Sequence, residues 1–205
     1  MRIEKLTELF LKFPGIGPRQ AKRFVYFLLR QPTAFTDALR EEIALLKKET
    51  GVCPSCLRFF EKRGTEKECS TCSDSSRDKS LLMIVGTDID FQNIEKSSHF
   101  KGRYFILGGM LSLLEKQPEK KIRIRELVET VANRLKEGGL KEIIFALNAT
   151  PEGEETVMYL KNALSSFAKA GLKLSSLGRG LSTGFELEYS DGETIRNALS
   201  GRTSH

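Results

Sequence analysis

The sequence predicts an α/β protein of more than one domain, in which a helical region and a cysteine-rich segment precede a mostly parallel sheet flanked by helices. Three observations predict this organisation. Apolar residues follow helical spacing within residues 1–50, all the cysteines cluster within residues 53–72, and apolar strands alternate with amphipathic helices from residue 80 onward. Strands that alternate with helices are typical of a parallel sheet covered on both faces.

The bulk composition fits a basic intracellular protein. A length of 205 residues suits one large domain or two small ones, and 40% hydrophobic residues can form a core. The net charge of +6 and a pI near 9.1 favour an anionic partner, nucleic acid first, although a merely soluble basic protein has the same bulk charge. The chain begins with a charged amphipathic helix, and no apolar run approaches membrane-spanning length. We therefore expect a cytoplasmic, reducing setting and no membrane partner.

The first two helices are predicted to form a hairpin. The first helix ends before Pro14, because proline cannot continue a helix. Gly15-Ile16-Gly17 follows as a tight turn, and Pro18 is well placed to start the second helix. Two helices joined by Gly-apolar-Gly form a helix-hairpin-helix, whose glycines let backbone N–H groups approach a phosphate. The apolar residues of the first helix are Ile3, Leu6, Leu9, Phe10 and Phe13.

The second helix has an apolar face and a basic face. The apolar face comprises Ala21, Phe24, Val25 and Leu28, whereas Arg19, Arg23, Tyr26 and Arg30 lie opposite and Lys22 borders them. No acidic residue occurs between Glu8 and Asp37. A surface that follows phosphates needs such a row of uncompensated cations, although a charged helix face is more often only solvated. We predict contacts to the DNA backbone, independent of base sequence, from Gly15, Gly17, Arg19, Lys22, Arg23 and Arg30.

A third helix is predicted from Thr36 or Asp37 to Thr50, with Gly51 as its stop. Its apolar face comprises Leu39, Ile43 and Leu46. Packing is the only role predicted for this helix.

The cysteines form two CxxC pairs, Cys53 with Cys56 and Cys69 with Cys72. Each CxxC turn brings two sulfurs near one ion, and four thiolates form the closed tetrahedral set of a structural zinc site. Two disulfides or four unrelated buried thiols are the alternatives. Disulfides would need an oxidising compartment, which nothing in the sequence indicates. Four protein ligands leave no open position for catalytic water, so we predict one structural Zn²⁺ per chain.

Most of the positive charge within the cysteine-rich segment is offset: Glu61, Glu66 and Glu68 stand among Arg58, Lys62, Arg63 and Lys67. The uncompensated charge lies in the preceding hairpin. A segment this short cannot hold a core without a metal. The four cysteines, called the quartet below, are therefore predicted to act as a brace that fixes the angle between the helices and the α/β body.

The C-terminal part alternates between strands and helices. Strands are predicted at 81–85, 104–107, 142–147 and 173–177, and helices at 123–137 and 154–170. In parallel sheets, functional residues lie at the carboxyl ends of strands. Those ends carry Gly86-Thr87-Asp88, Gly108-Gly109 and residues 148–154. The carboxylates predicted to form an acidic surface there are Asp88, Asp90, Glu152 and Glu154.

A succession of motifs over nearly the whole chain resembles the bacterial recombination mediator family RecR. In order they are Phe13-Pro14-Gly15-Ile16-Gly17-Pro18, the quartet, Arg77-Asp78, Gly102-Arg103-Tyr104, Leu107-Gly108-Gly109, Glu152-Gly153-Glu154 and Leu187-Glu188-Tyr189. The resemblance implies a helix-hairpin-helix region at 1–52, a four-cysteine zinc finger at 53–78, a Toprim domain at 79–178, and a C-terminal Walker-B-like segment and tail at 179–205.

This resemblance also implies a function. The family consists of non-enzymatic DNA-binding proteins of recombinational repair, which form ring-like homo-oligomers around DNA and act with RecO and RecF. The protein would be associated with the bacterial nucleoid, as a dimer or a tetramer. The family's DNA-contacting positions match Arg19 and Arg23, and its acidic surface, which is implicated in binding RecO, matches the four carboxylates named above.

Three positions depart from catalytic Toprim domains, which hold Mg²⁺ with a Glu after the first strand and an Asp-x-Asp pair after a later one. Gly86 replaces the Glu, which RecR proteins usually keep, and Asn148 and Thr150 replace the two Asp. Mg²⁺ prefers carboxylate oxygens, so this set makes a poor site. The nearby carboxylates either bind an ion weakly or form only a solvated acidic rim.

Near the C-terminus, Ser182-Thr183-Gly184-Phe185 precedes Leu187-Glu188-Tyr189, where the family has a tight Gly-Gly turn before a strand. Phe185 adds bulk in a region that helps to join protomers in the family. The Leu-Glu-Tyr strand is expected to persist, either at a protomer interface or simply completing the sheet. Two other functions remain open: a Toprim-type metal-dependent nuclease or primase-like enzyme, and a scaffold that binds only proteins.

Overall fold

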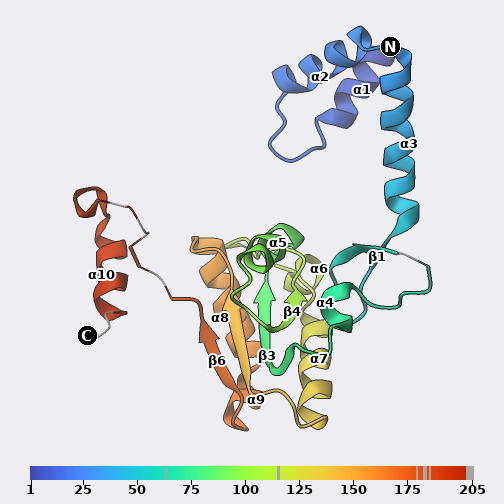
Figure 1. Cartoon of the computed structure of the whole chain (residues 1–205). Coiled ribbons are helices and arrows are strands. Elements are labelled where there is room, and N and C mark those ends of the chain that lie inside the picture. The colour runs from blue at the N-terminus through green and yellow to red at the C-terminus, as the bar shows by residue number, and fades with distance from the viewer. Residues whose placement is uncertain (63, 115, 179, 182–183, 185, 202–205) are drawn as a thin grey trace. The chain divides into compact units, whose positions relative to one another are not determined.

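The computed structural model describes residues 1–62, 64–114, 116–178, 180–181, 184 and 186–201 (Figure 1). The chain divides into two compact units. The first comprises Met1–Gly51 and Glu61–Arg63, and the second comprises Val52–Phe60 and Gly64–His205. Within the described residues, no helix is both long and apolar enough to cross a membrane.

The first unit is helical, as the sequence predicts. Helix α1 spans Arg2–Phe10 and helix α2 spans Pro18–Arg30. The two pack through Phe10 and Phe24, whose ring centroids lie 5.5 Å apart in an edge-to-face arrangement. Ala21 and Val25 of α2 are buried, in agreement with the predicted apolar face.

Helix α3 spans Thr33–Glu49 and differs from its prediction at both ends. It starts three residues before Thr36, with Pro32 at the N-cap position. Gly51 is not a helix stop: it lies inside strand β1 (Thr50–Val52), which pairs with strand β2 (Phe59–Glu61). None of the residues of α3 is buried, although Phe35 packs edge-to-face on Phe27 of α2 with ring centroids 6.0 Å apart. The predicted apolar residues Leu39, Ile43 and Leu46 are 38%, 60% and 65% exposed.

The second unit contains the four-stranded sheet, in the order β4-β3-β5-β6 with every strand pair parallel. Strand β3 spans Asp78–Val85, β4 spans Gly102–Ile106, β5 spans Glu142–Ala146 and β6 spans Lys173–Ser176. The α/β fold class is therefore confirmed. The chain passes from β3 to β4 on one side and then crosses to β5 on the other side of β3, so the direction of strand order reverses at β3. Parallel sheets present functional residues at such a reversal.

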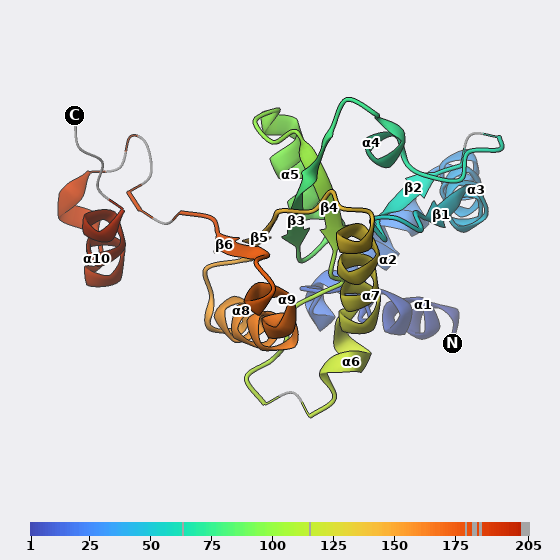
Figure 2. The same ribbon diagram turned by 90° about the horizontal axis from the view of Figure 1, so that it is seen from below.

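Helices cover both faces of the sheet (Figure 2). On one face, α7 (Ile124–Lys136) and α8 (Pro151–Ala163) bury Leu127, Val131 and Leu160 against alternate residues of the strands. On the other face, α5 (Asp88–Ser97) packs Phe91 against Tyr104, with ring centroids 4.8 Å apart. Residues of β3 alternate between these two cores, as the pleat requires: Leu82 and Ile84 face one, Met83 and Val85 the other.

The predicted helix at 154–170 is two helices that begin earlier. Helix α8 starts at Pro151, because the Thr150 side chain accepts a hydrogen bond from the Gly153 N–H and proline fits the first turn. It ends where Leu164 leaves helical geometry (φ −97°, ψ 6°), and α9 (Ser165–Lys169) follows.

Several short elements were not expected from the sequence. Besides β1 and β2, they are α4 (Ser70–Ser73), α5, α6 (Pro118–Lys121) and α10 (Gly192–Ser200). The start of α5 does carry a sequence signal, a capping box formed by Thr87 and Asp90.

The expected strand at Leu187–Tyr189 is wrong. These residues form a 3₁₀ helix, η1, in which the N–H groups of Tyr189 and Ser190 donate to carbonyls three residues earlier. These N–H groups are therefore not available to pair with a neighbouring strand. The expectation concerning Phe185, and those for Ser182 and Thr183, lie outside the described residues.

Candidate metal centre and nucleic-acid interface

The quartet is brought together by two backbone turns. In the first, the Leu57 N–H donates to the Cys53 carbonyl (2.8 Å) and the Cys53 N–H to the Arg58 carbonyl (2.9 Å). In the second, Cys69 caps α4, and the Cys72 N–H donates to the Cys69 carbonyl (2.9 Å). The two turns also meet directly, since the Cys69 N–H donates to the Cys53 Sγ at 3.5 Å. N–H donors to sulfur of this kind stabilise thiolates.

The quartet fits one tetrahedral metal ion. All four Sγ atoms lie within 4.8 Å of one another, and those of Cys56 and Cys69 are 3.6 Å apart. Four sulfurs at about 2.3 Å from a central ion would be separated by roughly 3.8 Å. All four cysteines are buried and are free thiols, so the disulfide alternative finds no support. Among the described residues, the quartet is the only cluster of metal-ligating side chains close enough to hold an ion.

The thiols influence one another's ionisation. The pKa of Cys53 is lowered, because Cys56, Cys69 and Cys72 can all donate hydrogen bonds to its sulfur. The pKa of Cys56 is raised, because it serves Cys53 as a donor and because burial disfavours another thiolate. A metal that binds four thiolates must therefore displace protons, so its apparent affinity falls as the pH is lowered.

The cysteine-rich segment is bonded to the sheet within the second unit. The Ile106 N–H, at the end of β4, donates to the Cys56 carbonyl at 2.8 Å. The Arg123 guanidinium joins the carbonyls of Leu57 and Ile106. On the other side of the segment, the Asp88 carboxylate accepts the Phe59 N–H at 2.8 Å. Hydrogen bonds to backbone groups of the cysteine-rich segment thus hold this segment against the edge of the sheet.

The basic face of α2 is exposed as predicted from the helical pattern. Gly15, in the preceding turn, has a φ of +75°, a conformation that glycine adopts without strain. Gly17 caps α2 in extended geometry without a side-chain bond to the helix, which leaves the first N–H groups of α2 open to a ligand. The exposed cations are Arg19, Lys22, Arg23 and Arg30. None of them forms an ion pair with a carboxylate in the part of the chain that the structure describes.

The four predicted acidic residues are not gathered into one metal-holding group in the described structure. Asp88 binds the Phe59 N–H, and the Asp90 carboxylate accepts the Thr87 N–H (2.9 Å) and hydroxyl (2.8 Å). Both side chains are therefore used for local structure. Glu152 and Glu154 lie exposed in the first turn of α8.

The positions where catalytic Toprim domains carry carboxylates are occupied differently here. A Cβ at Gly86 would lie 2.6 Å from the Met110 Cε and 3.2 Å from the Asp90 Oδ2. Met110 thus fills the space that a longer side chain at position 86 would enter. The Thr150 hydroxyl accepts the Gly153 N–H at 3.2 Å and so serves as a helix cap.

The comparisons with known proteins agree with this arrangement. The family model described as a Toprim domain matches residues 80–177, which span β3 to β6. A protein of Bdellovibrio bacteriovorus named "Recombination protein RecR" is 36% identical over 202 residues, covering 98% of this chain and 96% of the relative. The chain belongs to the RecR family. RecR proteins of Syntrophotalea carbinolica (37% identical, covering 97% of this chain and 94% of the relative) and Bacteroides thetaiotaomicron (36%, covering 98% and 93%) are similarly close.

Two residues of this RecR-family chain have structural roles that the sequence did not predict. Arg123, which bonds the finger to β4, was assigned only to the start of a helix. Arg103 belongs to a motif of the RecR resemblance, but nothing in the sequence indicates that it donates to the carbonyls of Thr71 and Cys72. A cation inside an apolar strand is the signal that could have identified it, because a buried cation requires partners.

Proposed function

We propose that this protein is a non-enzymatic DNA-binding mediator of recombinational repair that assembles as a ring-like homo-oligomer around DNA. The observation that carries the proposal is the basic face of α2, with exposed Arg19, Lys22, Arg23 and Arg30 on a helix that follows a Gly-Ile-Gly turn. These cations would lie along phosphates, while the N–H groups after Gly17 approach the backbone. Contacts of this kind position the duplex without reading its sequence.

The metal in the quartet is proposed to be one structural Zn²⁺ per chain. Four thiolates in a tetrahedral set favour zinc or an iron–sulfur centre. A single ion fits the quartet, because the sulfurs are close enough to share one centre. Cys53, Cys56, Cys69 and Cys72 would be its ligands. Metal analysis of purified protein is the direct test, and one zinc per chain is the expected result.

Several features support a protein without a catalytic step. Position 86 has no carboxylate and its space is filled by Met110, while Asn148 and Thr150 replace the Asp pair. An amide and a hydroxyl are poor ligands for Mg²⁺. Nuclease and primer-synthesis assays with Mg²⁺ or Mn²⁺ test this point. We expect no turnover, and robust turnover would establish the enzymatic alternative instead.

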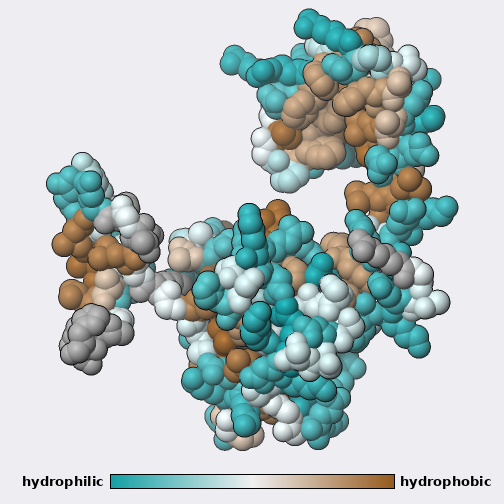
Figure 3. Space-filling view, in the orientation of Figure 1, coloured by the Kyte–Doolittle hydropathy of each residue, from teal (hydrophilic) through white to brown (hydrophobic). Residues whose placement is uncertain are grey.

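Exposed apolar side chains support assembly with further copies of the chain. They gather on the N-terminal helices and around α10 (Figure 3). On α3, Ile43 and Leu46 are 60% and 65% exposed, and near the C-terminus Tyr189 and Leu199 are 71% and 59% exposed. Burial of such side chains stabilises an interface by about 25 cal/mol per Å² of apolar area. Solution mass measurements should therefore find a dimer or a tetramer.

RecO and RecF are the proposed protein partners. The acidic surface of Asp88, Asp90, Glu152 and Glu154 is the proposed contact for RecO. Glu152 and Glu154 lie exposed in the first turn of α8 and should contribute to that contact. The proposed division of labour is DNA binding by 1–52, metal binding by 53–78, partner binding by 79–178 and assembly by 179–205. A cytoplasmic, nucleoid-associated location follows from this role.

A salt-titrated DNA-binding measurement with R19A/R23A tests the DNA interface. For duplex DNA, the logarithm of affinity falls with the logarithm of salt by about 0.9 per phosphate contact. Removal of two contacts should therefore reduce the slope by about 1.8 for each protomer on the DNA. The matched control is K47A/K48A, which removes the same charge from the last turn of α3. Equal slopes for R19A/R23A and the control would refute the proposed interface.

A further inference from the structure

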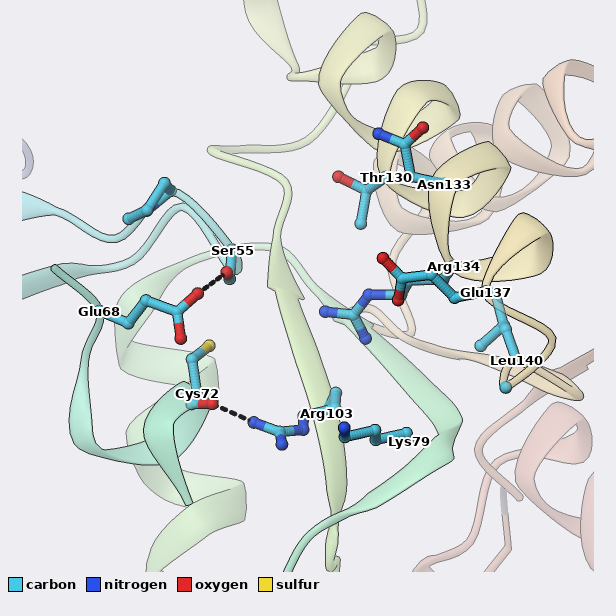
Figure 4. A pocket seen from close by; sticks show the side chains of 12 residues that line it. Ser55, Glu68, Cys72, Lys79, Arg103, Thr130, Asn133, Arg134, Glu137 and Leu140 are labelled. Atoms are coloured by element: carbon cyan, nitrogen blue, oxygen red, sulfur yellow. Dashed lines mark hydrogen bonds between the residues drawn. The ribbon is translucent and has the colours of Figure 1, made fainter. Parts of the chain in front are cut away.

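A cavity of about 470 Å³ lies within the second unit, between the cysteine-rich segment, the sheet and α7 (Figure 4). Its walls carry charged side chains of both signs. Lys79 and Arg103 come from β3 and β4, Arg134 and Glu137 from the end of α7, and Glu68 and Cys72 from the cysteine-rich segment. Glu68 is already engaged, since it accepts the Ser55 hydroxyl. The quartet therefore borders a cavity in which cations outnumber carboxylates.

Arg103 is buried without a carboxylate partner. It is 8% exposed and is the only charged side chain in the buried set of the described residues. Its Nη1 donates to the carbonyls of Thr71, at 3.2 Å, and Cys72. No carboxylate in the described part of the chain forms an ion pair with it. Its hydrogen-bond acceptors are neutral carbonyls, and the carboxylate that its charge influences, Asp74, lies outside ion-pair distance. A further buried anion nearby would therefore offset part of the cost of burying this cation.

Arg134, on the α7 side of the cavity, also lacks an ion pair in the described part of the chain. Its side chain is half-buried and extends from α7 toward the wall that contains Cys72 (Figure 4). Within the described residues it makes no hydrogen bond and no ion pair within 4.0 Å, not even with Glu137. Burial lowers its pKa, Arg103 acts in the same direction, and the Glu137 carboxylate opposes both.

The metal-loaded quartet would add a buried negative charge beside both arginines, which form no ion pair with a carboxylate in the described part of the chain. Four thiolates around one divalent ion carry a net charge of −2. The four cysteines are at most 8% exposed, so water can do little to solvate that charge. Cys72 links the two arginines to the cluster, because its carbonyl accepts from Arg103 and its side chain lines the cavity that Arg134 enters.

We propose that Arg103 and Arg134 are positioning residues for the metal, which compensate the charge of the zinc-loaded quartet and thereby raise its zinc affinity. The inference rests on the zinc site proposed above. Both arginines belong to the α/β body, whereas the ligands belong to the cysteine-rich segment. Zinc affinity then depends on the segment being docked on the sheet, and zinc loading strengthens that docking in return.

Competition with a chromophoric chelator measures the zinc affinity of the full chain and its variants. Outer groups of this kind change metal affinity by about 10- to 100-fold, so R134M should bind zinc about 10-fold more weakly. The control is R125M, an exposed arginine on the same helix, which should match the parent. Affinity in R134M equal to that in R125M would overturn the inference. Parent protein that binds no zinc would instead refute the zinc site itself.

Two further variants separate charge from hydrogen bonding. R103K retains the charge but not the guanidinium geometry, so charge compensation predicts an affinity closer to the parent than to R103M. Affinity as low as that of R103M would contradict charge compensation at this position. C72H keeps four ligands but reduces the cluster charge to −1, so the loss caused by R134M should shrink from about 10-fold to about 3-fold. An undiminished loss in that background would also contradict the inference.

Discussion

Placing a carboxylate at position 86, at the carboxyl end of β3, tests whether steric crowding prevents a metal site there. In Gly86→Glu, the new Cβ would lie 2.6 Å from the Met110 Cε, where ordinary carbon contacts are about 3.5–4.0 Å. The methionine end group must therefore move by roughly 1 Å. Asp90 is the second neighbour, with its Oδ2 3.2 Å from that Cβ.

The cost of G86E has a steric and an electrostatic part. Overpacking of this degree costs about 1–3 kcal/mol, with the lower end expected because the tip of a flexible side chain can move. The carboxylate of Asp90 would raise the pKa of the new Glu above its unfolded value of about 4.3. A carboxyl whose pKa is raised by folding destabilises the fold above the unfolded pKa. The electrostatic cost of G86E should therefore be present at about pH 7 and vanish near pH 4.

Urea unfolding of G86E, M110A and G86E/M110A measures both parts. Since Met110→Ala opens the space that the new side chain needs, the double variant should be more stable than the sum of the single changes predicts, by about 1 kcal/mol. Mg²⁺ should not rescue G86E, because Asn148 and Thr150 still provide no carboxylate. Strict additivity would refute the steric role of Met110, and stabilisation by millimolar Mg²⁺ would refute the loss of the metal site.

Three further predictions follow from individual contacts. Verified removal of zinc should lower the melting temperature measured by calorimetry, because a segment this short has little core without its metal; an unchanged transition would contradict the brace role. Gly153→Ala should destabilise by about 3 kcal/mol or more in urea, since its Cβ would lie 1.9 Å from the Asn148 carbonyl oxygen, which is backbone; a loss below about 1 kcal/mol would contradict this clash. The pKa of Glu142 is lowered chiefly by the hydrogen bond from Ser175 and then by Lys173. Ionised Glu142 therefore contributes its full stabilisation of the fold above its unfolded pKa, and this stabilisation is lost as the pH falls through the lower folded pKa. The S175A variant should weaken the dependence of melting temperature on pH below about 4.5. The same dependence in S175A and the parent would exclude this link.

Much of the fold could be predicted from the sequence, because the signals were periodic or compositional. Buried strands read as apolar runs such as 81–85, and the parallel order followed from their alternation with helices. The quartet could be predicted because CxxC spacing is itself a geometric constraint. The basic face of α2 could be predicted because helical period alone decides which residues share a face.

The parts that sequence reasoning missed depend on backbone groups or on weak patterns. Every residue has a carbonyl, so nothing in the sequence marks those of Leu57 and Cys72 as acceptors for arginines. Helix α5 was missed because its apolar residues do not form one clean stripe: Phe91 is 3% exposed, whereas Ile89 is 69% exposed. At Leu187–Tyr189, a family pattern was read as a strand although local turn bonds satisfy the backbone.

The cysteine-rich segment covers part of the edge of the sheet. Strand β4 lies at the edge of the sheet, and its Leu107 neighbour donates inward to Val85 while the Ile106 N–H points outward. That outward donor is satisfied by the carbonyl of Cys56, so the backbone of a quartet residue covers the end of an otherwise open edge. A metal bound by the quartet would hold the Cys56 carbonyl in place for the Ile106 N–H, so metal binding and docking on the sheet would stabilise each other. Loss of the metal should free this edge for pairing with another chain, and metal-depleted protein should consequently aggregate in light-scattering measurements at temperatures where the loaded protein stays dispersed.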